Sequence, residues 1–418
     1  MLIYCLDLYE NLAYYSACLF NKKELKKMQE AYLIGGLRTA VGKASKGGFR
    51  FTRPDDLAVD LIQQLLKKYP NLAPEQVDDL IVGNAVPEAE QGLQIGRWIA
   101  LRALGQGVAG VVVNRYCGSG VETIAMAVAK IKAGMAECII AGGTESMSLV
   151  PTVGWKTAPS YACAKSNPEY YVGMGLTAEL VSKKFNISRE VQDQFAFNSH
   201  QKAIAAIAAG RFVDEIAPIE VEEIYLDENQ KKVSRTITIT QDEGPRKDTT
   251  LEALAKLKPM FANPGTVTAG NSSQTSDGAA FVIVMSERLM KQLNLHPMAR
   301  MLSCTSVGVA PTLMGMGPVA AIPKALRLAG LQLHDIEQFE LNEAFAAQAL
   351  AVIQEIQLDA SKINVNGGAI ALGHPLGCSG AKLSIQLLNE MQRRQQKYGI
   401  VSACIGGGQG IAAVFERL

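Results

Sequence analysis

Residues Val111-Val112-Val113-Asn114-Arg115-Tyr116-Cys117-Gly118-Ser119-Gly120, followed by Val121-Glu122-Thr123-Ile124-Ala125-Met126-Ala127-Val128-Ala129, join a β-branched run to an alanine-rich run. This order predicts a strand, a glycine-containing turn and a helix, with Cys117 at the junction. Unpaired N–H groups and the helix dipole at such a junction favour a thiolate. The stretch therefore indicates either a nucleophilic cysteine or, as for most free cysteines, a small buried side chain.

The composition is that of an ordinary globular protein. The chain has 418 residues, of which 48% are hydrophobic and 19% charged, and a formal net charge of +1. This length allows two or three domains. The near-zero charge gives no overall attraction to nucleic acid or to a membrane surface. No apolar run in the sequence is long enough to span a membrane.

The cysteines and the first residues indicate a compartment. The eight cysteines form no C-x-x-C pair and no metal-ligand pattern with the four histidines, so we expect reduced thiols, a cytoplasmic location and no metal site. Residues 1–27 contain Asp7 and Glu10 but no arginine, which fits neither a secretory signal nor a mitochondrial transit peptide. We expect the first strand only after Met28, with residues 1–28 as an N-terminal extension.

The chain contains a weak internal repeat. Residues 72–84 resemble residues 331–343, and Ser119-Gly120 recurs as Ser379-Gly380, at offsets of 259 and 260. In both copies a predicted helix leads to an apolar strand that ends in glycines. Such alternation predicts mainly parallel sheets covered by helices. Cys117 then corresponds to Gly377, so the two halves carry different chemistry at equivalent turns.

The middle of the chain differs from both halves. Residues 149–270 hold two proline-containing loops, a predicted helix over about 189–209 and a charged, strand-like stretch near 219–240. Ser188 is a good N-cap for that helix, and Gly210 is well placed after its end. We expect an inserted loop domain over 149–270. Residues 29–148 with 271–292 then form the first half, and residues 293–418 the second.

His374 is the candidate base. It lies between Gly373 and Pro375 in a glycine-rich turn, where no bulky neighbour would keep a substrate from the ring. A lone histidine is usually structural or solvent-exposed, but the repeat places this one three residues before the position that matches Cys117. A Cys–His pair that faces across two related halves is suited to nucleophilic catalysis.

Two other cysteines compete for the role of a second thiol. Cys404 precedes Ile405-Gly406-Gly407-Gly408 at the end of a predicted strand, where several N–H groups can converge on an oxyanion. Cys378 lies in the turn after His374, and the residues alone do not rank the two. Asn342 either orients a water or caps the next helix. Glu343 is equally well explained as an acid in the first turn of that helix.

From about residue 30 to the C-terminus, the sequence is similar to the thiolase family, and most to its 3-ketoacyl-CoA thiolases. The resemblance rests on the joint order and spacing of seven blocks: Arg38-Thr39-Ala40, Cys117-Gly118-Ser119-Gly120, Ala141-Gly142-Gly143-Thr144-Glu145-Ser146-Met147-Ser148, Thr268-Ala269-Gly270-Asn271-Ser272-Ser273, Asn342-Glu343-Ala344-Phe345, Gly373-His374-Pro375-Leu376-Gly377 and Cys404-Ile405-Gly406. It implies an α/β fold of two duplicated mixed-sheet half-domains in five layers, α-β-α-β-α, with an inserted loop domain.

The resemblance also implies catalytic roles. It makes Cys117 the acylated nucleophile and His374 its base, and it selects Cys404 over Cys378 as the acid/base thiol. Cys378 is then a packing residue. Backbone N–H groups of Cys117 and Gly406 would form one oxyanion hole, and His374 with a water held by Asn342 would form the other.

Coenzyme A enters as a substrate in this resemblance, and no metal or prosthetic group is implied. The implied CoA-binding residues are Arg246, Ala269, Ser273, Met174, Met314 and Phe345, although Met314 and Phe345 would also suit an ordinary core. Short-chain biosynthetic thiolases carry a histidine before the Met-Gly pair of the loop domain, whereas here Gly173 precedes Met174-Gly175. The missing side chain favours longer acyl chains, and hence thiolysis in fatty-acid β-oxidation.

The predicted activity is that of an acetyl-CoA C-acyltransferase. The alternatives are a biosynthetic acetoacetyl-CoA thiolase, a ketoacyl synthase, which the residues after Cys404 disfavour, and a non-catalytic thiolase-like lipid-binding protein. That last class should lack Cys117, His374 or Cys404, and all three are present. The resemblance further implies a homodimer or homotetramer and allows a β-oxidation multienzyme partner.

Overall fold

The computed structural model describes residues 29–418. The strands are β1 (Ala31–Arg38), β2 (Gly42–Lys43), β3 (Asp79–Gly83), β4 (Ala109–Val113), β5 (Cys138–Ser146), β6 (Ile219–Leu226), β7 (Lys232–Ile239), β8 (Ser276–Ser286), β9 (Ala299–Gly308), β10 (Gln338–Leu341), β11 (Tyr398–Ile405) and β12 (Gln409–Arg417). The α-helices are α2 (Pro54–Lys68), α3 (Ile95–Ala103), α4 (Ser119–Lys132), α5 (Tyr161–Ser166), α6 (Met174–Lys184), α7 (Arg189–Ala208), α8 (Leu251–Ala255), α9 (Glu287–Gln292), α10 (Gly317–Ala329), α11 (Ala346–Glu355), α12 (Ala369–Leu372) and α13 (Leu376–Arg394). Strands and helices alternate in both halves, as the sequence predicts.

The main sheet is mixed and consists of two halves joined at one point. Its strands lie in the order β10-β11-β12-β9-β1-β8-β5-β3-β4, with β2 beside β8. The two halves meet where β1 pairs with β9 at Leu33 and Ala299. The sheet therefore behaves as two smaller sheets, each with its own two faces to cover.

The two half-sheets share one strand pattern. In the first half, β5 is parallel to β3 and antiparallel to β8, and β8 is antiparallel to β1. In the second half, β11 is parallel to β10 and antiparallel to β12, and β12 is antiparallel to β9. The two copies of the predicted repeat thus occupy equivalent places, and β4 adds an edge strand to the first half.

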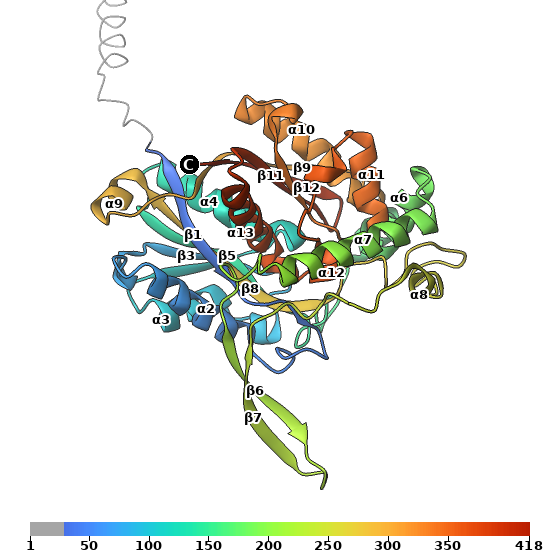
Figure 1. Ribbon diagram of the computed structural model, residues 1–418, viewed down its shortest axis with the longest axis horizontal. Helices are drawn as coiled ribbons and strands as arrows, with labels where there is room; N and C mark the ends of the chain where they lie inside the picture. The colour runs from blue at the N-terminus through green and yellow to red at the C-terminus, as the bar shows by residue number, and fades with distance from the viewer. Residues whose placement is uncertain (1–28) are drawn as a thin grey trace, which may run out of the picture.

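Helices cover both faces of each half-sheet, which produces the five layers expected. One apolar cluster joins α2 and α3 to the first half-sheet through residues such as Leu61 and Val82. A central cluster joins α4 and α13 to both half-sheets, with Ile81 and Val401 on opposite sides. A third joins α10 and α11 to the second half-sheet (Figure 1). Neighbouring strand residues, such as Ile81 and Val82, point into different clusters because side chains alternate across a strand.

The two central helices cross where the repeat places equivalent glycines. A Cβ atom on Gly120 would lie 2.4 Å from the backbone nitrogen of Ala381, and one on Gly380 would lie 2.4 Å from that of Val121. Both distances are too short for any side chain, so glycine is required at both positions. This contact brings the beginnings of α4 and α13 together, and with them the two turns that carry the candidate site.

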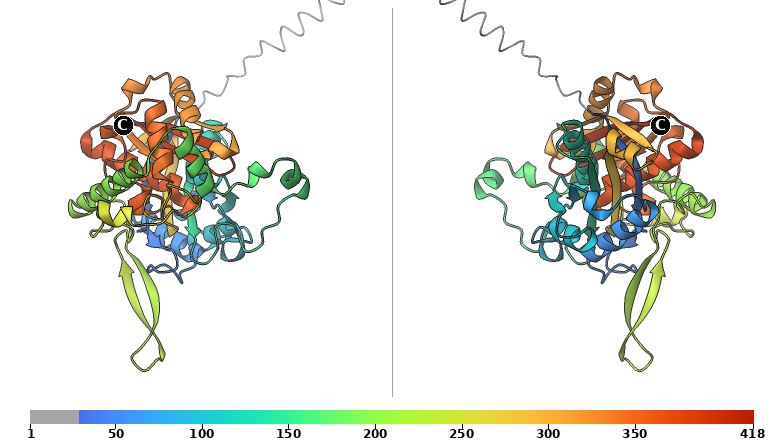
Figure 2. Two further views of the ribbon diagram at one scale, coloured as in Figure 1. Left: turned by 90° about the vertical axis from the view of Figure 1, so that its right-hand side faces the viewer. Right: turned by 90° about the vertical axis from the view of Figure 1, so that its left-hand side faces the viewer.

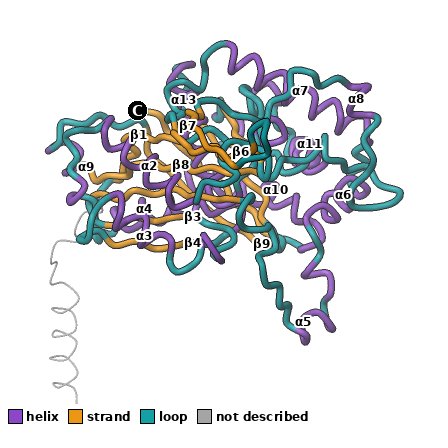
Figure 3. Tube along the Cα trace, turned by 90° about the horizontal axis from the view of Figure 1, so that it is seen from below, coloured by secondary structure: helices purple, strands orange, loops and turns teal. Residues whose placement is uncertain are grey.

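The segment between β5 and β8 carries elements outside the main sheet. Its long helix, α7, begins after Ser188, whose hydroxyl accepts the Val191 N–H, and Gly210 follows with φ of +68°, which confirms both predicted signals. The predicted strand-like stretch is the β6–β7 hairpin, which projects from the body (Figure 2). The loop around α5 also extends away from it (Figure 3).

Some predictions lie beyond these observations. The N-terminal extension, residues 1–28, lies outside the described residues, and the domain boundaries remain predictions. Within residues 29–418, no helix is both long and apolar enough to cross a membrane.

Candidate functional site

Cys117 lies in a strained turn at the beginning of α4. A short 3₁₀ helix, Tyr116–Gly118, runs directly into that helix. Tyr116 has φ of +42°, a left-handed conformation that is costly for a residue with a side chain. Asn114 Oδ1 accepts its N–H at 2.9 Å, and Ser119 Oγ donates to its carbonyl oxygen at 2.7 Å. These two hydrogen bonds hold the turn that presents the thiol.

Two backbone N–H groups converge on the Cys117 sulfur. They belong to Gly406, which follows β11 in the second half, and to Cys117 itself. This is the pair of amides that the sequence resemblance assigns to an oxyanion hole. The arrangement depends on tertiary structure, because its two donors lie 289 positions apart in the chain.

The electrostatics of Cys117 correct one expectation from sequence. The helix N-terminus was expected to favour a thiolate, but burial raises the pKa of the Cys117 thiol to about 11. The side chain is 4% exposed, and desolvation of the charged form outweighs the two N–H donors, which act in the opposite direction. The thiol of the free enzyme is therefore protonated at neutral pH.

His374 is buried as a neutral imidazole. Its Nε2 atom lies 3.3 Å from Asn342 Nδ2, and its Nδ1 atom lies 2.5 Å from Ser379 Oγ. Burial lowers the pKa of His374 to about 3, with a smaller contribution from Lys382. The same hydroxyl of Ser379 donates to the Pro375 carbonyl oxygen at 2.9 Å, so it accepts from Nδ1–H and leaves the lone pair on Nε2.

Asn342 and Glu343 do not play the structural roles that the sequence left open. Helix α11 begins at Ala346, its N-cap residue is Phe345, and no side chain caps it. Asn342 therefore faces His374 without capping the helix. Glu343 precedes the helix and is buried, where it accepts hydrogen bonds from Ser199 and Asn364 at 2.7 and 2.9 Å.

Cys404 and Cys378 occupy different surroundings. Cys404 lies one residue before the end of β11 and belongs to a small cluster with Met174, Met314 and Phe345. Burial raises the pKa of its thiol, and the neighbouring Cys117 raises it further. Cys378 lies on α13 within the large central apolar cluster. The structure thus brings Cys404, but not the core residue Cys378, into the group of predicted site residues.

The predicted CoA-binding residues form two groups. Arg246 and Ala269 line a cavity of about 420 Å³ together with His200. Met174, Met314 and Phe345 surround Cys404. Ser273 lies beside the second group, since its N–H donates to the carbonyl oxygen of Ala344, the neighbour of Phe345, at 2.9 Å.

The cavity and the turn that carries His374 share a wall. Gln274 lines the cavity, and its carbonyl oxygen accepts the His374 N–H at 3.2 Å. A ligand in the cavity would therefore lie beside the backbone that leads to His374.

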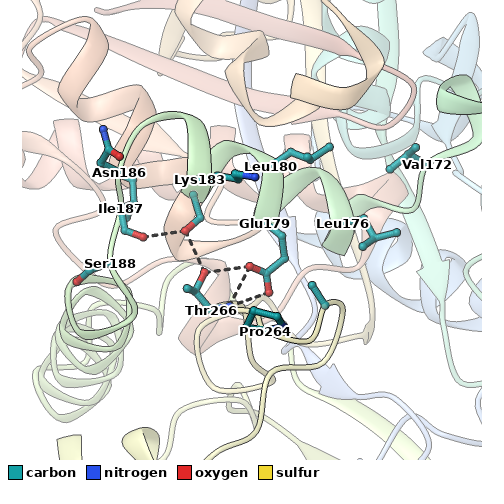
Figure 4. Close-up of a pocket in the computed structure, with 13 residues that line it drawn as sticks. Val172, Leu176, Glu179, Leu180, Lys183, Asn186, Ile187, Ser188, Pro264 and Thr266 are labelled. Atoms are coloured by element: carbon teal, nitrogen blue, oxygen red, sulfur yellow. Dashed lines mark hydrogen bonds between the residues drawn. The ribbon is translucent and has the colours of Figure 1, made fainter.

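A second cavity, of about 820 Å³, lies between α6 and the loop that contains Pro264 and Thr266 (Figure 4). It is lined by apolar residues such as Leu176 and Leu180 and by Glu179, which accepts the Thr266 and Val267 N–H groups at 2.9 and 2.8 Å. None of the predicted site residues lines this cavity, so we assign it no part in the chemistry.

Sequence reasoning missed several residues that shape the site. His200 lines the cavity with Arg246, and its Nδ1 accepts the Arg246 N–H at 3.2 Å. Ser379 contacts His374, and Glu145 binds the turn that follows His374. Ser379 and Glu145 belong to quoted motifs, but only their spatial neighbours reveal these contacts. The cysteines within residues 29–418 are free thiols, and no His, Cys, Asp and Glu group there could hold a metal ion.

Comparison with known proteins gives the family. Residues 31–288 match the model of the thiolase N-terminal domain, and residues 295–417 match that of the thiolase C-terminal domain. The chain belongs to the thiolase family. Among its relatives, the 3-ketoacyl-CoA thiolase of Bacillus subtilis is 53% identical over 93% of this chain and 100% of its own length.

Two further relatives have different names. The peroxisomal 3-ketoacyl-CoA thiolase 1 of Arabidopsis thaliana is 43% identical, over 96% of this chain and 91% of its own. The acetyl-CoA acetyltransferase of Escherichia coli is also 43% identical, over 94% of this chain and 100% of its own. The crystal structure of the Bacillus anthracis acetyl-CoA acetyltransferase has a TM-score of 0.83 and 37% identity, and the match covers 94% of this chain and 100% of that one.

Proposed function

We propose that this protein is a 3-ketoacyl-CoA thiolase, which uses CoA to cleave 3-ketoacyl-CoA into acetyl-CoA and an acyl-CoA shorter by two carbons. The convergence of the Cys117 and Gly406 N–H groups on the Cys117 sulfur carries the proposal. Such donors stabilise the oxyanion that forms when a nucleophile attacks a carbonyl, each by about 3–4 kcal/mol. The name of the Bacillus subtilis relative supports the same activity.

In the first half-reaction, Cys117 attacks the 3-keto carbon as His374 Nε2 takes the thiol proton. Because burial disfavours both the free thiolate and the free imidazolium, the proton moves as the carbon–sulfur bond forms. The Cys117 and Gly406 N–H groups bind the developing alkoxide. Cleavage of the carbon–carbon bond leaves the acyl group on Cys117 and releases an acetyl-CoA enolate.

The second thiol handles the released carbon. His374 and a water held by Asn342 bind the enolate oxygen, and Cys404 donates a proton to the enolate carbon to give acetyl-CoA. Cys404 then takes the thiol proton of incoming CoA, whose sulfur attacks the acyl-Cys117 thioester. This step releases the shortened acyl-CoA and restores the Cys117 thiol, with His374 returning the proton.

CoA binding follows from the two residue groups. We assign the nucleotide end of CoA to Arg246 in the cavity, the pantetheine to Ala269 and Ser273, and the thioester end to Met174, Met314 and Phe345. The cytoplasmic location, the homo-oligomer, a β-oxidation partner and the absence of a cofactor remain predictions of the same proposal.

The reverse reaction, condensation of two acetyl-CoA molecules, would use the same groups, and the name of the Escherichia coli relative keeps it as the second candidate. Both are tested by mixing the protein with CoA and 3-ketoacyl-CoA of increasing chain length, starting with acetoacetyl-CoA, and following the 3-ketoacyl absorbance. We expect loss of absorbance with chains longer than four carbons. Loss with acetoacetyl-CoA alone would favour the biosynthetic branch, and no loss with any chain would contradict the thiolase proposal.

A further inference from the structure

A buried carboxylate, which the proposed mechanism does not use, lies next to the catalytic turn. Glu145 is near the end of β5 and is 1% exposed. No lysine, arginine or histidine forms an ion pair with it among residues 29–418. An unpaired buried carboxylate is costly unless hydrogen bonds compensate, so its partners indicate why it is there.

The partners of Glu145 are all N–H donors. Oε2 accepts the backbone N–H groups of Ala85 and Gly377, both at 2.8 Å. Oε1 accepts from the side chain of Gln91 at 2.8 Å and from that of Asn84 at 3.4 Å. A protonated carboxyl would point its own hydrogen at a donor, so the arrangement fits the ionised form. Burial raises the pKa of Glu145 to about 7 against these hydrogen bonds, which leaves it mostly ionised at pH 8.

The two backbone donors belong to different halves of the molecule. Ala85 follows β3 in the first half, whereas Gly377 is in the first turn of α13, three residues after His374. That turn lies directly on the ends of β3 and β5. A Cβ atom on Gly143 would lie 2.2 Å from the Gly377 carbonyl oxygen, and one on Gly83 would lie 2.6 Å from it. The carboxylate of Glu145 thus bridges the two halves at a point where their backbones are in close contact.

Both parts of the catalytic pair adjoin this bridge. Ala85, which donates one of the two backbone hydrogen bonds, lies in one apolar cluster with Cys117. Leu376, the residue before the other donor, Gly377, belongs to the same cluster. The His374 turn is the segment that Glu145 holds through Gly377. Small displacements of Ala85 or Gly377 relative to Glu145 would therefore change the distance between the Cys117 thiol and the His374 imidazole.

We infer that Glu145 is a positioning residue, which holds the His374 turn of the second half against the Cys117 turn of the first and, at pH 8, places a negative charge near the thiol. The inference rests on the proposed function, because it concerns the same Cys–His pair. It has two separable consequences. Removal of the carboxylate should loosen the pair and slow acylation, and removal of its charge should make the free thiolate easier to form, since Glu145 raises the pKa of Cys117.

The test compares Glu145→Gln with wild type at pH 8. Because an error of about 1 Å in position can cost roughly 100-fold in rate, we expect kcat to fall roughly 10- to 100-fold, with KM for CoA within about twofold of wild type. In the free enzyme, alkylation of Cys117 by iodoacetamide, followed on the Cys117 peptide by mass spectrometry, should become roughly threefold faster. That figure allows for the lower intrinsic nucleophilicity of a thiolate of lower pKa.

Two further variants control the result. Glu179→Gln makes the same change in a carboxylate that also accepts two backbone N–H groups but lies on α6, away from Cys117, and should leave both rates unchanged. Glu145→Asp keeps the charge on a shorter side chain, so kcat should fall without faster alkylation. Circular dichroism and thermal melting show whether Glu145→Gln folds. If it does not, Glu145→Asp still tests the positioning role.

The outcomes separate the two proposals. A loss of turnover in Glu145→Gln with alkylation unchanged or slower would reduce Glu145 to a structural residue and overturn the inference, and so would unchanged turnover. Faster alkylation in Glu145→Asp would also contradict it, because the charge is kept. If the wild type cleaves no 3-ketoacyl-CoA, the proposed function fails, while the alkylation rates still report on the charge of Glu145.

Discussion

The Nδ1 atom of His374 lies 2.5 Å from the hydroxyl of Ser379, and that hydroxyl donates to the carbonyl oxygen of Pro375. Ser379 is therefore committed as an acceptor for Nδ1–H, and the basic lone pair is held on Nε2. The proposed base is therefore defined by its tautomer as well as by its place.

Ser379→Ala should lower kcat with little change in KM, because the ring loses the partner that fixes its tautomer. We expect a loss of roughly 10-fold, since a neutral hydroxyl orients less strongly than a carboxylate would. Ser384→Ala is the matched control: Ser384 makes the same kind of bond within α13, to the Gly380 carbonyl oxygen at 2.8 Å, without contacting histidine. Equal losses in both variants would contradict the tautomer argument.

Intact-mass measurement should distinguish the roles of Cys117 and Cys404. After 3-ketoacyl-CoA is added without CoA, intact-mass measurement should show no acyl adduct in Cys117→Ala. Cys404→Ala should still form the adduct but turn over slowly, because Cys117 can attack while the enolate lacks its proton donor. A persistent adduct in Cys117→Ala would refute the assignment of the nucleophile.

Gly173 should influence which acyl chain lengths the protein accepts in its substrate. A Cβ atom there would meet no other atom within 4 Å, and its φ and ψ of −63° and 145° suit any residue. Gly173→His should fold normally and reduce kcat/KM for long 3-ketoacyl chains more than for acetoacetyl-CoA, because the ring would occupy open space before Met174. Gly173→Ala should leave the ratio of the two values close to wild type. An unchanged ratio in Gly173→His would remove Gly173 from the acyl pocket.

Arg246 should matter for the nucleotide end of CoA. We expect Arg246→Ala to raise KM for CoA roughly 10-fold, as expected when a charged hydrogen bond is lost. Thiolysis by a short thiol without a nucleotide, such as pantetheine, should be unaffected, because it lacks the part of CoA that Arg246 would bind. Arg288→Ala, at an exposed site on α9, is the control. Equal effects on CoA and pantetheine would contradict the assignment.

Acid should destabilise the fold partly through His200. Burial lowers the pKa of His200 to about 4 from 6.5, so its contribution is fully present above pH 6.5 and is lost as the pH falls toward 4. His200→Asn removes this proton uptake and should flatten the fall in unfolding free energy by up to about 1.4 kcal/mol per pH unit in that window. Urea unfolding at several pH values measures it, with exposed His334→Asn as control. If unfolding free energy falls with pH at the same slope in His200→Asn and wild type, protonation of His200 is not the cause.

Much of the fold could be predicted because its signals are local. The β-branched run that ends at Val113, the N-cap at Ser188 and the glycine at 210 each act through neighbours in sequence. The repeat, together with the family resemblance, further indicated that Cys117 and His374 come from equivalent turns of two halves. The burial of Glu343 was harder to predict, because a buried acid before a helix and an exposed acid within its first turn look alike in sequence.

The sequence, together with its family resemblance, determined the alternation of strands and helices, the duplication and the candidate residues Cys117, His374, Asn342 and Cys404. Tertiary structure alone decided the protonation state and the hydrogen-bond partners of these groups. The helix N-terminus at Cys117 indicated a thiolate, yet the thiol has a raised pKa because segments from both halves bury it. Desolvation depends on every segment that covers a group, and so do the contacts of Ser379 with His374 and of Glu145 with Gly377. No local pattern contains that information.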